Sequence, residues 1–451
     1  MIHNIIDTST TIVAPATAAG GAVMVTRLSG SRAIEIADRV FRGRKPLSEC
    51  DGYTLHYGTI RNEQGEVVDD VVVALFRAPN SYTGDDTVEI TTHGSEHICS
   101  ELLRLAISCG ATMATAGEFT RRAFLAGKMD LSRAEAVADI ISSDSRWAHT
   151  IATTQMRGGY SAKLAKMRDE LLRLCSLLEL ELDFSEEDVE FADRTTLRNM
   201  LADVELQVST LLSSFSVGNA IKNGVNVAIV GEPNVGKSTL LNALVEDDRA
   251  MVSDVAGTTR DTIEATTIID GIRFRFVDTA GIRDTENQLE RMGIERTHRA
   301  IEKAHIILHL TSADSPEFKA VERTDSQHYI QVINKIDKVN SIDNAASKEV
   351  IKISAKQNVG IDELRNALRS TVDTSALNAN SVVVSNMRHY AALRAAHEAL
   401  TSARAALDNN IPSDLVSEDI RQVLHHLGEI TGEITSDDIL HSIFSKFCIG
   451  K

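Results

Sequence analysis

The eight residues from Gly231 to Ser238 have the spacing of a phosphate-binding loop. They read G-E-P-N-V-G-K-S and match G-x-x-x-x-G-K-[ST], between an apolar run at 225–230 and a helix-like run at 239–245. Glycines let backbone N–H groups surround a phosphate at a helix N-terminus, and Lys237 can reach the outer phosphates. The Ser238 hydroxyl can bind Mg²⁺. The sequence therefore predicts a nucleoside triphosphate site.

Two segments further along the chain can complete the metal and γ-phosphate environment. A polar segment about 20 residues downstream contains Thr258 and Thr259, and Thr259 is our candidate for the second Mg²⁺ ligand. An alternating strand at 273–277 then leads into Asp278-Thr279-Ala280-Gly281. We expect the Asp278 carboxylate near the metal and the Gly281 N–H near the γ-phosphate.

The base should be guanine. Asn334-Lys335-Ile336-Asp337 follows a strand-like run, and Ser354-Ala355-Lys356 follows another. A carboxylate at Asp337 can accept two parallel hydrogen bonds from guanine N1–H and its amino group, which adenine does not offer.

Apolar spacing predicts the elements that position these segments. A compact α/β unit is predicted first, with strands at Ala22–Arg27, Val71–Phe76 and Thr87–Thr92 and a helix at Ser31–Phe41. Apolar residues, mostly leucines, recur at steps of three and four residues over 164–178 and 197–211, as in bundle helices. Leu393, Leu400 and Leu407, seven residues apart, restore helical spacing later in the chain. An Asp270-Gly271 turn between alternating runs predicts a β-hairpin beside the nucleotide site.

The fold class is therefore predicted as α/β plus all-α. We expect an N-terminal α/β domain over 1–117, a helical bundle in two parts, 118–222 and 374–451, and an α/β domain over 223–373 inserted between them. Domains with neighbouring termini tolerate such insertions.

Length and composition exclude several classes of protein. A chain of 451 residues is long enough for about three domains, and its net charge of −17 argues against a sequence-blind nucleic-acid coat. The five cysteines form no C-x-x-C pair, which favours a reducing compartment. With no apolar run of transmembrane length and no signal-peptide pattern, we expect a cytoplasmic protein.

Together the nucleotide motifs resemble those of the Ras-like GTPases, over about 223–373. Many such domains carry a catalytic Gln directly after D-x-x-G, whereas Ile282 stands there in this chain. Another group must therefore orient the attacking water, and the loop from Arg283 to Glu290 offers candidates.

Nearly the whole chain resembles the MnmE (TrmE) family of tRNA uridine-modifying GTPases. The residues that carry this resemblance are Asn80-Ser81-Tyr82-Thr83-Gly84, Gly117-Glu118-Phe119-Thr120, Arg122-Ala123-Phe124, Gly257-Thr258-Thr259-Arg260-Asp261, Glu429-Ile430-Thr431-Gly432-Glu433 and Phe447-Cys448-Ile449-Gly450-Lys451.

The resemblance implies a set of ligands for the GTPase domain. Mg²⁺ would be held by Ser238 and Thr259, and K⁺ by Asn234, Ser253, Val255 and Thr258, while Glu290 would be the catalytic residue that orients the water. The implied GTP-binding residues are Asn234, Val235, Gly236, Lys237, Ser238, Thr239, Ser253, Asp254, Val255, Ala256, Gly257, Thr258, Thr259, Asp278, Thr279, Ala280, Gly281, Asn334, Lys335, Asp337, Ser354, Ala355 and Lys356.

The resemblance also implies a folate site and several partners. Arg27, Glu89, Lys128 and Lys451 would bind a 5-formyl- or methylene-tetrahydrofolate, with Cys448 nearby, in a homodimer formed through the N-terminal domains. Without the resemblance, Arg27 and Lys128 would be interpreted as solvated charges. The family assembles as a heterotetramer with the FAD-binding protein MnmG and adds a (carboxymethyl)aminomethyl group at C5 of the wobble uridine in certain tRNAs.

Other functions and sites were weighed against these. A ribosome-assembly GTPase is the main alternative, but residues 376–451 lack the basic G-x-x-G module typical of such proteins. A scaffold that uses nucleotide only for stability is a third hypothesis. His93 and His97 could bind a metal, yet Gly94 weakens a helix there and no third ligand is apparent. The basic cluster Arg121, Arg122, Lys128 and Arg133 could contact tRNA, but a solvated helix face is the preferred interpretation.

Overall fold

A computed structural model describes residues 9–18, 20–183, 194–245, 264–278, 298–325, 327–339, 350–372, 382–409 and 411–451. The chain divides into two compact units, Met1–Ala138 with His425–Lys451, and Asp139–Leu424. Helices α4 (Leu131–Ser142) and α13 (Ser413–Thr431) contain the two boundaries between the units.

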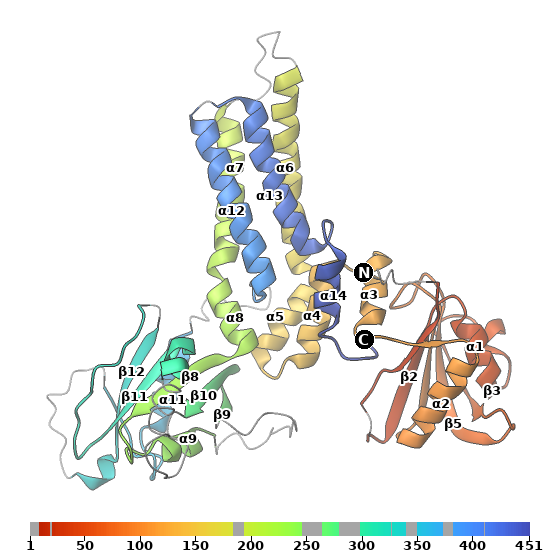
Figure 1. Cartoon of the computed structure of the whole chain (residues 1–451), viewed down its shortest axis with the longest axis horizontal. Helices are drawn as coiled ribbons and strands as arrows, with labels where there is room; N and C mark the ends of the chain where they lie inside the picture. The colour runs from red at the N-terminus through yellow and green to blue at the C-terminus, as the bar shows by residue number, and fades with distance from the viewer. Residues whose placement is uncertain are drawn as a thin grey trace. The chain divides into compact units, whose positions relative to one another are not determined.

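The first unit is built on a seven-stranded sheet in the order β3-β4-β5-β6-β2-β1-β7 (Figure 1). The pairs are antiparallel apart from β1 with β7. The strands are β1 (Ile12–Pro15), β2 (Val23–Ser29), β3 (Phe41–Gly43), β4 (Thr54–Arg61), β5 (Val67–Phe76), β6 (Thr87–His93) and β7 (Thr112–Met113).

Helices cover one face of this sheet, and the opposite face is exposed over β4 and β5. Helices α1 (Ala33–Val40) and α2 (Glu96–Ser108) pack on the covered face, around a core that includes Val73, Ile90 and Leu102. The alternate positions of β4 and β5, such as Tyr57 and Val72, are exposed. These elements confirm the strands and the helix predicted before residue 100.

The C-terminal segment of the chain belongs to the same unit. Helix α14 (Asp437–Phe444) packs with α3 (Glu118–Leu125), and Phe444 and Phe447 share an apolar cluster with Leu131. Near the end of the chain, Ile449 forms an isolated antiparallel bridge with Ala116, outside the strands of the sheet.

The second unit contains long helices that lie side by side (Figure 1). Helices α6 (Gly159–Asp183) and α7 (Arg194–Ser213) precede the nucleotide-binding segments, whereas α12 (Met387–Asp408) and α13 follow them. The leucine stripes are buried as predicted, including Leu171, Leu201 and Leu400. Because α7 packs on α12, the intervening α/β segment is an insertion in a helical bundle.

The inserted segment forms a six-stranded sheet in the order β13-β12-β11-β8-β10-β9, parallel except for β9. Its elements are β8 (Val225–Gly231), α9 (Lys237–Val245), β9 (Glu264–Ile269), β10 (Ile272–Asp278), β11 (Ile306–Ser312), β12 (His328–Asn334), β13 (Ile351–Lys352) and α11 (Ile361–Ser370). The β9–β10 hairpin turns at Asp270-Gly271, as predicted.

A single tryptophan joins the bundle to the inserted domain. Trp147 lies on α5 (Arg146–Met156) and packs against the core of the six-stranded sheet. It also faces the hairpin turn, since a Cβ atom added at Gly271 would lie 3.2 Å from Trp147 Cδ1. No helix in the described part of the chain combines the length and apolar character of a transmembrane span.

Candidate functional site

The phosphate-binding loop connects β8 to α9, the strand–loop–helix order that its sequence predicts. Its glycines are required by close contacts, because a Cβ at Gly231 would lie 2.3 Å from the Leu310 carbonyl oxygen. Gly236 has a φ of 99°, and a Cβ there would lie 2.4 Å from Asn334 Nδ2. A side chain at either position would displace a neighbouring segment.

The Lys237 side chain is buried within this loop. Its Nζ donates hydrogen bonds to the carbonyl oxygens of Gly231, at 2.7 Å, and Glu232, at 3.1 Å. An ammonium with three donors can hold the loop in this way and still donate to a phosphate oxygen. Ser238 follows in the first turn of α9, where its hydroxyl lies at the positive end of the helix dipole.

Asn334 connects the guanine-binding segments to the phosphate loop. Its Nδ2 donates to the Val235 carbonyl oxygen at 2.9 Å, and its Oδ1 accepts from Lys335 N at 2.8 Å and Ala355 N at 3.0 Å. The Lys335 Nζ also donates to the Asn234 carbonyl oxygen at 2.5 Å. Three segments separated by about 20 to 100 residues therefore meet at one buried amide.

Asp337, the residue predicted to bind the guanine base, has a hydrogen-bonded carboxylate. Its Oδ1 accepts a 2.6 Å hydrogen bond from Ser354 Oγ, and its side chain is otherwise exposed. This hydrogen bond lowers the pKa of Asp337 below its ordinary value, which keeps the carboxylate ionised. Lys356, two residues after Ser354, is also exposed.

The remaining predicted nucleotide residues are only partly placed. Asp278 ends β10 opposite Ile229 of β8, two residues before the phosphate loop begins. The other predicted contacts lie outside the described residues: Ser253, Asp254, Val255, Ala256, Gly257, Thr258, Thr259, Thr279, Ala280, Gly281 and Glu290.

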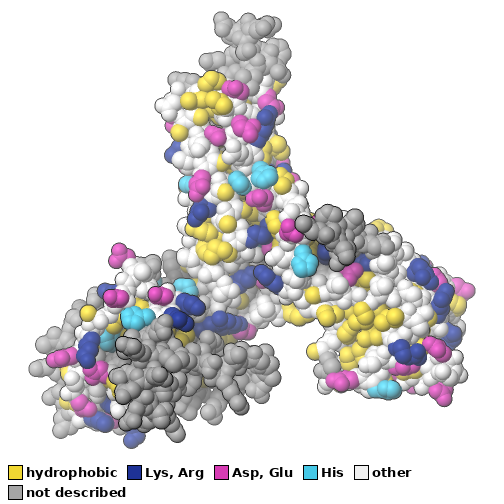
Figure 2. All heavy atoms as spheres, viewed as in Figure 1, with side chains coloured by type: hydrophobic (Ala, Val, Ile, Leu, Met, Phe, Trp, Pro, Cys, Tyr) yellow, Lys and Arg dark blue, Asp and Glu magenta, His cyan; other side chains and the backbone are white. Residues whose placement is uncertain are grey.

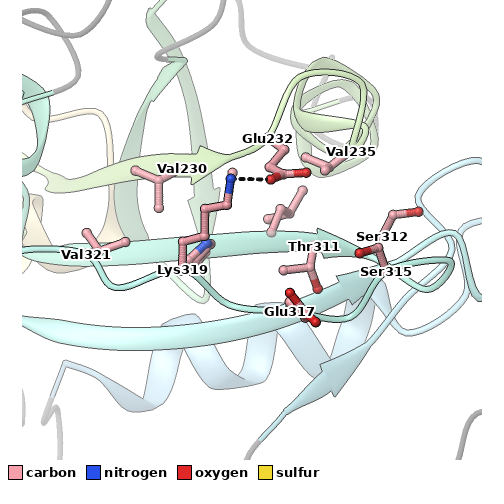
Figure 3. Close-up of a pocket in the computed structure, with 12 residues that line it drawn as sticks. Val230, Glu232, Val235, Thr311, Ser312, Ser315, Glu317, Lys319 and Val321 are labelled. Atoms are coloured by element: carbon pink, nitrogen blue, oxygen red, sulfur yellow. Dashed lines mark ion pairs between the residues drawn. The ribbon is translucent and has the colours of Figure 1, made fainter.

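A pocket of about 300 Å³ adjoins the phosphate loop on the side of β11 (Figure 3). Glu232 and Lys319 face each other across it in a 2.7 Å ion pair between exposed side chains. Because both side chains are exposed to solvent, the pair contributes little to stability. The pocket shares Gly231, Glu232 and Val235 with the loop, but Ser238 and Asp337 do not line it.

Arg27 is the centre of the second predicted site, on the open face of the N-terminal sheet. It pairs with Glu89 across β2 and β6, with Nε 2.8 Å from Oε1. Its guanidinium also lies 5.6 Å from the ring centre of Tyr82 and 5.5 Å from that of Phe119. Only 14% of the Arg27 side chain is exposed, so it is not a solvated surface charge.

The C-terminal segment reaches this arginine. The Gly450 carbonyl oxygen accepts a 3.3 Å hydrogen bond from Arg27 Nη1, and Gly117 N donates to the Cys448 carbonyl oxygen at 3.4 Å. Gly450 has a φ of 96°, and a Cβ there would lie 2.0 Å from the Pro15 carbonyl oxygen. The structure thus brings Arg27, Glu89 and the C-terminal segment together.

Lys128, Lys451 and Cys448 are the other residues of the predicted folate site. Lys128 is half-buried and lies against Gly84, whose added Cβ would be 3.5 Å from Lys128 Cε. Lys451 is half-buried and the Cys448 thiol is exposed. Sequence reasoning missed the roles of Tyr82 and Phe119, because spacing along the chain does not reveal rings that approach from distant segments.

The predicted solvated helix face around Arg121 and Arg122 is wrong for Arg122. This side chain is 2% exposed and pairs with Glu118 at 2.9 Å, one turn earlier on α3. Its Nη1 also donates to the Thr10 carbonyl oxygen at 2.7 Å. The guanidinium is therefore a buried connection between α3 and the start of the described chain.

Comparisons with known proteins show which family the chain belongs to. A family described as "GTP-binding protein TrmE N-terminus" matches residues 11–128, and one described as "MnmE helical domain" matches residues 131–448. The tRNA modification GTPase MnmE of Flavobacterium psychrophilum is 49% identical, over 98% of this chain and 99% of that protein. The protein of the same name from Bacteroides fragilis is also 49% identical, with the same coverage.

The chain belongs to the MnmE family. It is a GTPase involved in tRNA modification, as the full-length matches and the GTPase motifs together indicate. The predicted fold class is confirmed, with a TrmE-type N-terminal domain and an MnmE helical domain. Among solved structures, Aquifex aeolicus Era bound to GDP and AlF₄⁻ covers 38% of this chain and 65% of its own, at 28% identity and a TM-score of 0.26.

Proposed function

We propose that this MnmE-family chain is a K⁺-stimulated GTPase that, with the FAD-binding protein MnmG, modifies C5 of the wobble uridine in certain tRNAs. In this proposal a one-carbon tetrahydrofolate supplies the carbon, and the product carries a (carboxymethyl)aminomethyl group. The observation that supports it best is the pair of sites above, one built for a guanine nucleotide and the other around a half-buried arginine–carboxylate pair.

The GTPase step rests on the phosphate loop and two ions. Mg²⁺ would be held by Ser238 and Thr259, and it would neutralise charge on the β- and γ-phosphates. Ser238 fits this role because it lies at the start of α9, beside the buried Lys237 ammonium. Lys237 would orient the phosphates, and Glu290 would orient the attacking water.

A bound K⁺ would supply the positive charge that other systems provide with an arginine finger. Its proposed ligands are Asn234, Ser253, Val255 and Thr258. Asn234 supports the assignment because its φ of 65° and the Lys335 bond to its carbonyl oxygen fix the loop at that point. Turnover in KCl should exceed turnover in NaCl at equal ionic strength, and equal rates would contradict the potassium site.

Loss of Glu290 tests the water-orienting role separately. The Glu290→Ala variant should lower kcat by roughly tenfold to a hundredfold while GTP affinity stays near that of the unmodified protein. Weakened GTP affinity with an unchanged kcat would instead assign Glu290 to nucleotide binding.

The folate site fits the chemistry of the residues around Arg27. Tetrahydrofolate has carboxylates and a pterin with donor and acceptor edges, which a guanidinium, a carboxylate and two lysines can bind. We propose that Arg27, Glu89, Lys128 and Lys451 contact it, with Cys448 at its border. Tyr82 and Phe119 would hold the Arg27 guanidinium in place.

The open face of the N-terminal sheet supports the proposed homodimer. Leu55, Tyr57 and Val72 are exposed there by 72%, 70% and 40%, and Tyr57 pairs with Val72 across β4 and β5. Figure 2 shows exposed hydrophobic side chains gathered on this unit. A second copy covering this face would bury them beside Arg27 and Glu89, which lie on the same side of the sheet.

The whole proposal is tested in cells that lack this chain. Nucleoside analysis of their tRNA should show loss of the C5 modification at the wobble uridine, restored by the unmodified gene. Co-purification of the tagged chain should recover a flavoprotein. Normal nucleosides in the deletion strain would overturn the proposed function.

A further inference from the structure

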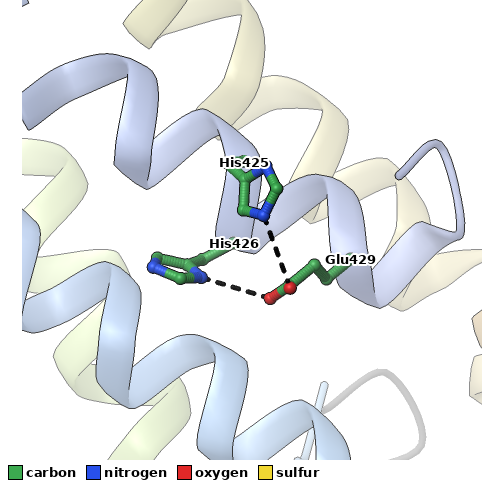
Figure 4. A group of neighbouring side chains, drawn as sticks. All are labelled: His425, His426 and Glu429. Carbon is green, nitrogen blue, oxygen red and sulfur yellow. Dashed lines mark hydrogen bonds and ion pairs between the residues drawn. The ribbon is translucent and has the colours of Figure 1, made fainter. Parts of the chain in front are cut away.

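Helix α13 ends with a cluster of three metal-ligating side chains that the sites above do not use. His425, His426 and Glu429 place one ligand atom each within 4.8 Å of one another (Figure 4). It is the one group of three or more His, Cys, Asp or Glu side chains with this property among the described residues.

Helix geometry explains why the three side chains converge. Successive residues are turned by roughly 100° around a helix axis, so Glu429 lies angularly between His425 and His426. Each imidazole then approaches a different oxygen of the same carboxylate. His425 Nε2 is 3.5 Å from Oε1, and His426 Nδ1 is 3.1 Å from Oε2.

The spacing and the donor types suit a transition metal. Ligand atoms bound to one Zn²⁺ at about 2.0–2.2 Å lie roughly 3.3–3.6 Å apart in a tetrahedron, and the two His–Glu distances of 3.5 and 3.1 Å are close to that range. Two imidazoles and one carboxylate are typical ligands of Zn²⁺, whereas Mg²⁺ and Ca²⁺ prefer oxygen atoms alone. The side chains are 51%, 28% and 35% exposed, which leaves access for the ion and for a water ligand.

We propose that His425, His426 and Glu429 form a Zn²⁺-binding site on α13. Three protein ligands with an open fourth position would hold one ion per chain. Because Glu429 is only three residues before Gly432, which packs against Phe124 and Leu131, the ion would stabilise the last turns of α13 where the chain leaves the helix.

The histidine pair at His93 and His97 provides an internal contrast. His93 ends β6 and its Nδ1 lies 2.7 Å from Asp69 Oδ1, whereas His97 is on α2. These two histidines are four residues apart in the sequence but lie on different elements. They form no group of three within the described chain, which makes them a matched control.

The test uses the full-length protein without a polyhistidine tag, stripped of metal and titrated with Zn²⁺ by calorimetry and with Co²⁺ by visible absorption. We expect one ion per chain and a Co²⁺ spectrum of low coordination number. Cys448→Ser should leave both unchanged, which excludes binding at the exposed thiol.

The variants His425→Ala, His426→Ala and Glu429→Gln should each weaken Zn²⁺ binding at least tenfold, whereas His93→Ala and His97→Ala should not. A GTPase turnover and a circular dichroism spectrum equal to those of the unmodified protein establish that each variant is folded. Absence of Zn²⁺ binding by the unmodified protein at micromolar concentration would overturn the proposal. Binding that is unchanged in a folded His425→Ala, His426→Ala double variant would also overturn it.

Discussion

The nucleotide site and the proposed folate site of this chain are built in different ways. At the nucleotide site, the Asn334 amide hydrogen-bonds to backbone atoms of Val235 and Ala355, which lie in two other short nucleotide-binding motifs. At the N-terminal site, Arg27 joins Glu89 to Gly450, a residue 423 positions away in the chain. The first site is thus encoded locally in the sequence, while the second depends on how the chain ends pack together.

The largest expected effect is a loss of GTP affinity when the base-recognition residue Asp337 is replaced. Asp337→Asn keeps one acceptor oxygen for guanine N1–H but turns an amide NH₂ toward the guanine amino group, so one hydrogen bond becomes a donor–donor contact and GTP binding should weaken at least ~100-fold. It should also raise the affinity for xanthosine triphosphate. Asp362→Asn, an exposed aspartate on α11, is the matched control. Unchanged GTP affinity in Asp337→Asn would refute this role.

The same replacement made in both sites tests their independence. Gly236→Ala places a methyl group against Asn334 Nδ2 at a positive φ, and we expect GTP affinity to fall roughly tenfold to a hundredfold. Folate binding by this variant should not change. Titration with GTP and with 5-formyl-tetrahydrofolate measures both, and a loss of both affinities would argue that the sites are coupled.

Gly450→Ala is the converse experiment. Its methyl group would clash with the Pro15 carbonyl oxygen and displace the C-terminal segment from Arg27, so we expect folate affinity to fall by about tenfold with GTP affinity preserved. Gly65→Ala is the control, because Gly65 has a φ of 84° with no atom within 4 Å of an added Cβ. If Gly450→Ala and Gly65→Ala lose folate affinity equally, the loss comes from strain at a positive φ and not from the broken contact between Gly450 and Arg27.

The smallest expected effect is a pH dependence confined to the inserted domain. Burial lowers the pKa of His309, which lies on β11 with Nδ1 2.6 Å from the Tyr329 hydroxyl. The unfolded chain therefore binds more protons than the folded domain as the pH falls through the ordinary histidine pKa. The free energy of unfolding should decrease between pH 7.5 and 5.5.

Denaturant titrations at the two pH values measure this decrease. His309→Gln should reduce it, and the same replacement at exposed His328 should not. Burial lowers the pKa of His305 in the same direction, so part of the dependence should persist in His309→Gln. A stability that rises on acidification would contradict the assignment.

Most of the fold and the nucleotide site could be predicted from the sequence because their patterns are local. The strand–loop–helix order around Lys237 and the leucine stripes of α6 and α7 depend on spacings of a few residues. The surroundings of Arg27 depend on Phe119 and Gly450, and only family resemblance indicated that these regions meet. Arg122 was misjudged because a charged residue on a helix is usually solvated, whereas here Glu118 compensates its burial.

The position of Trp147 gives the protein an intrinsic optical reporter. It is the sole indole in the chain, and it lies where α5 of the bundle meets the β9–β10 turn of the inserted domain. Its fluorescence emission therefore reports on one junction, without labelling and without background from other tryptophans. A change in emission upon nucleotide addition would indicate, in real time, that the GTPase domain shifts against the helix that supports it.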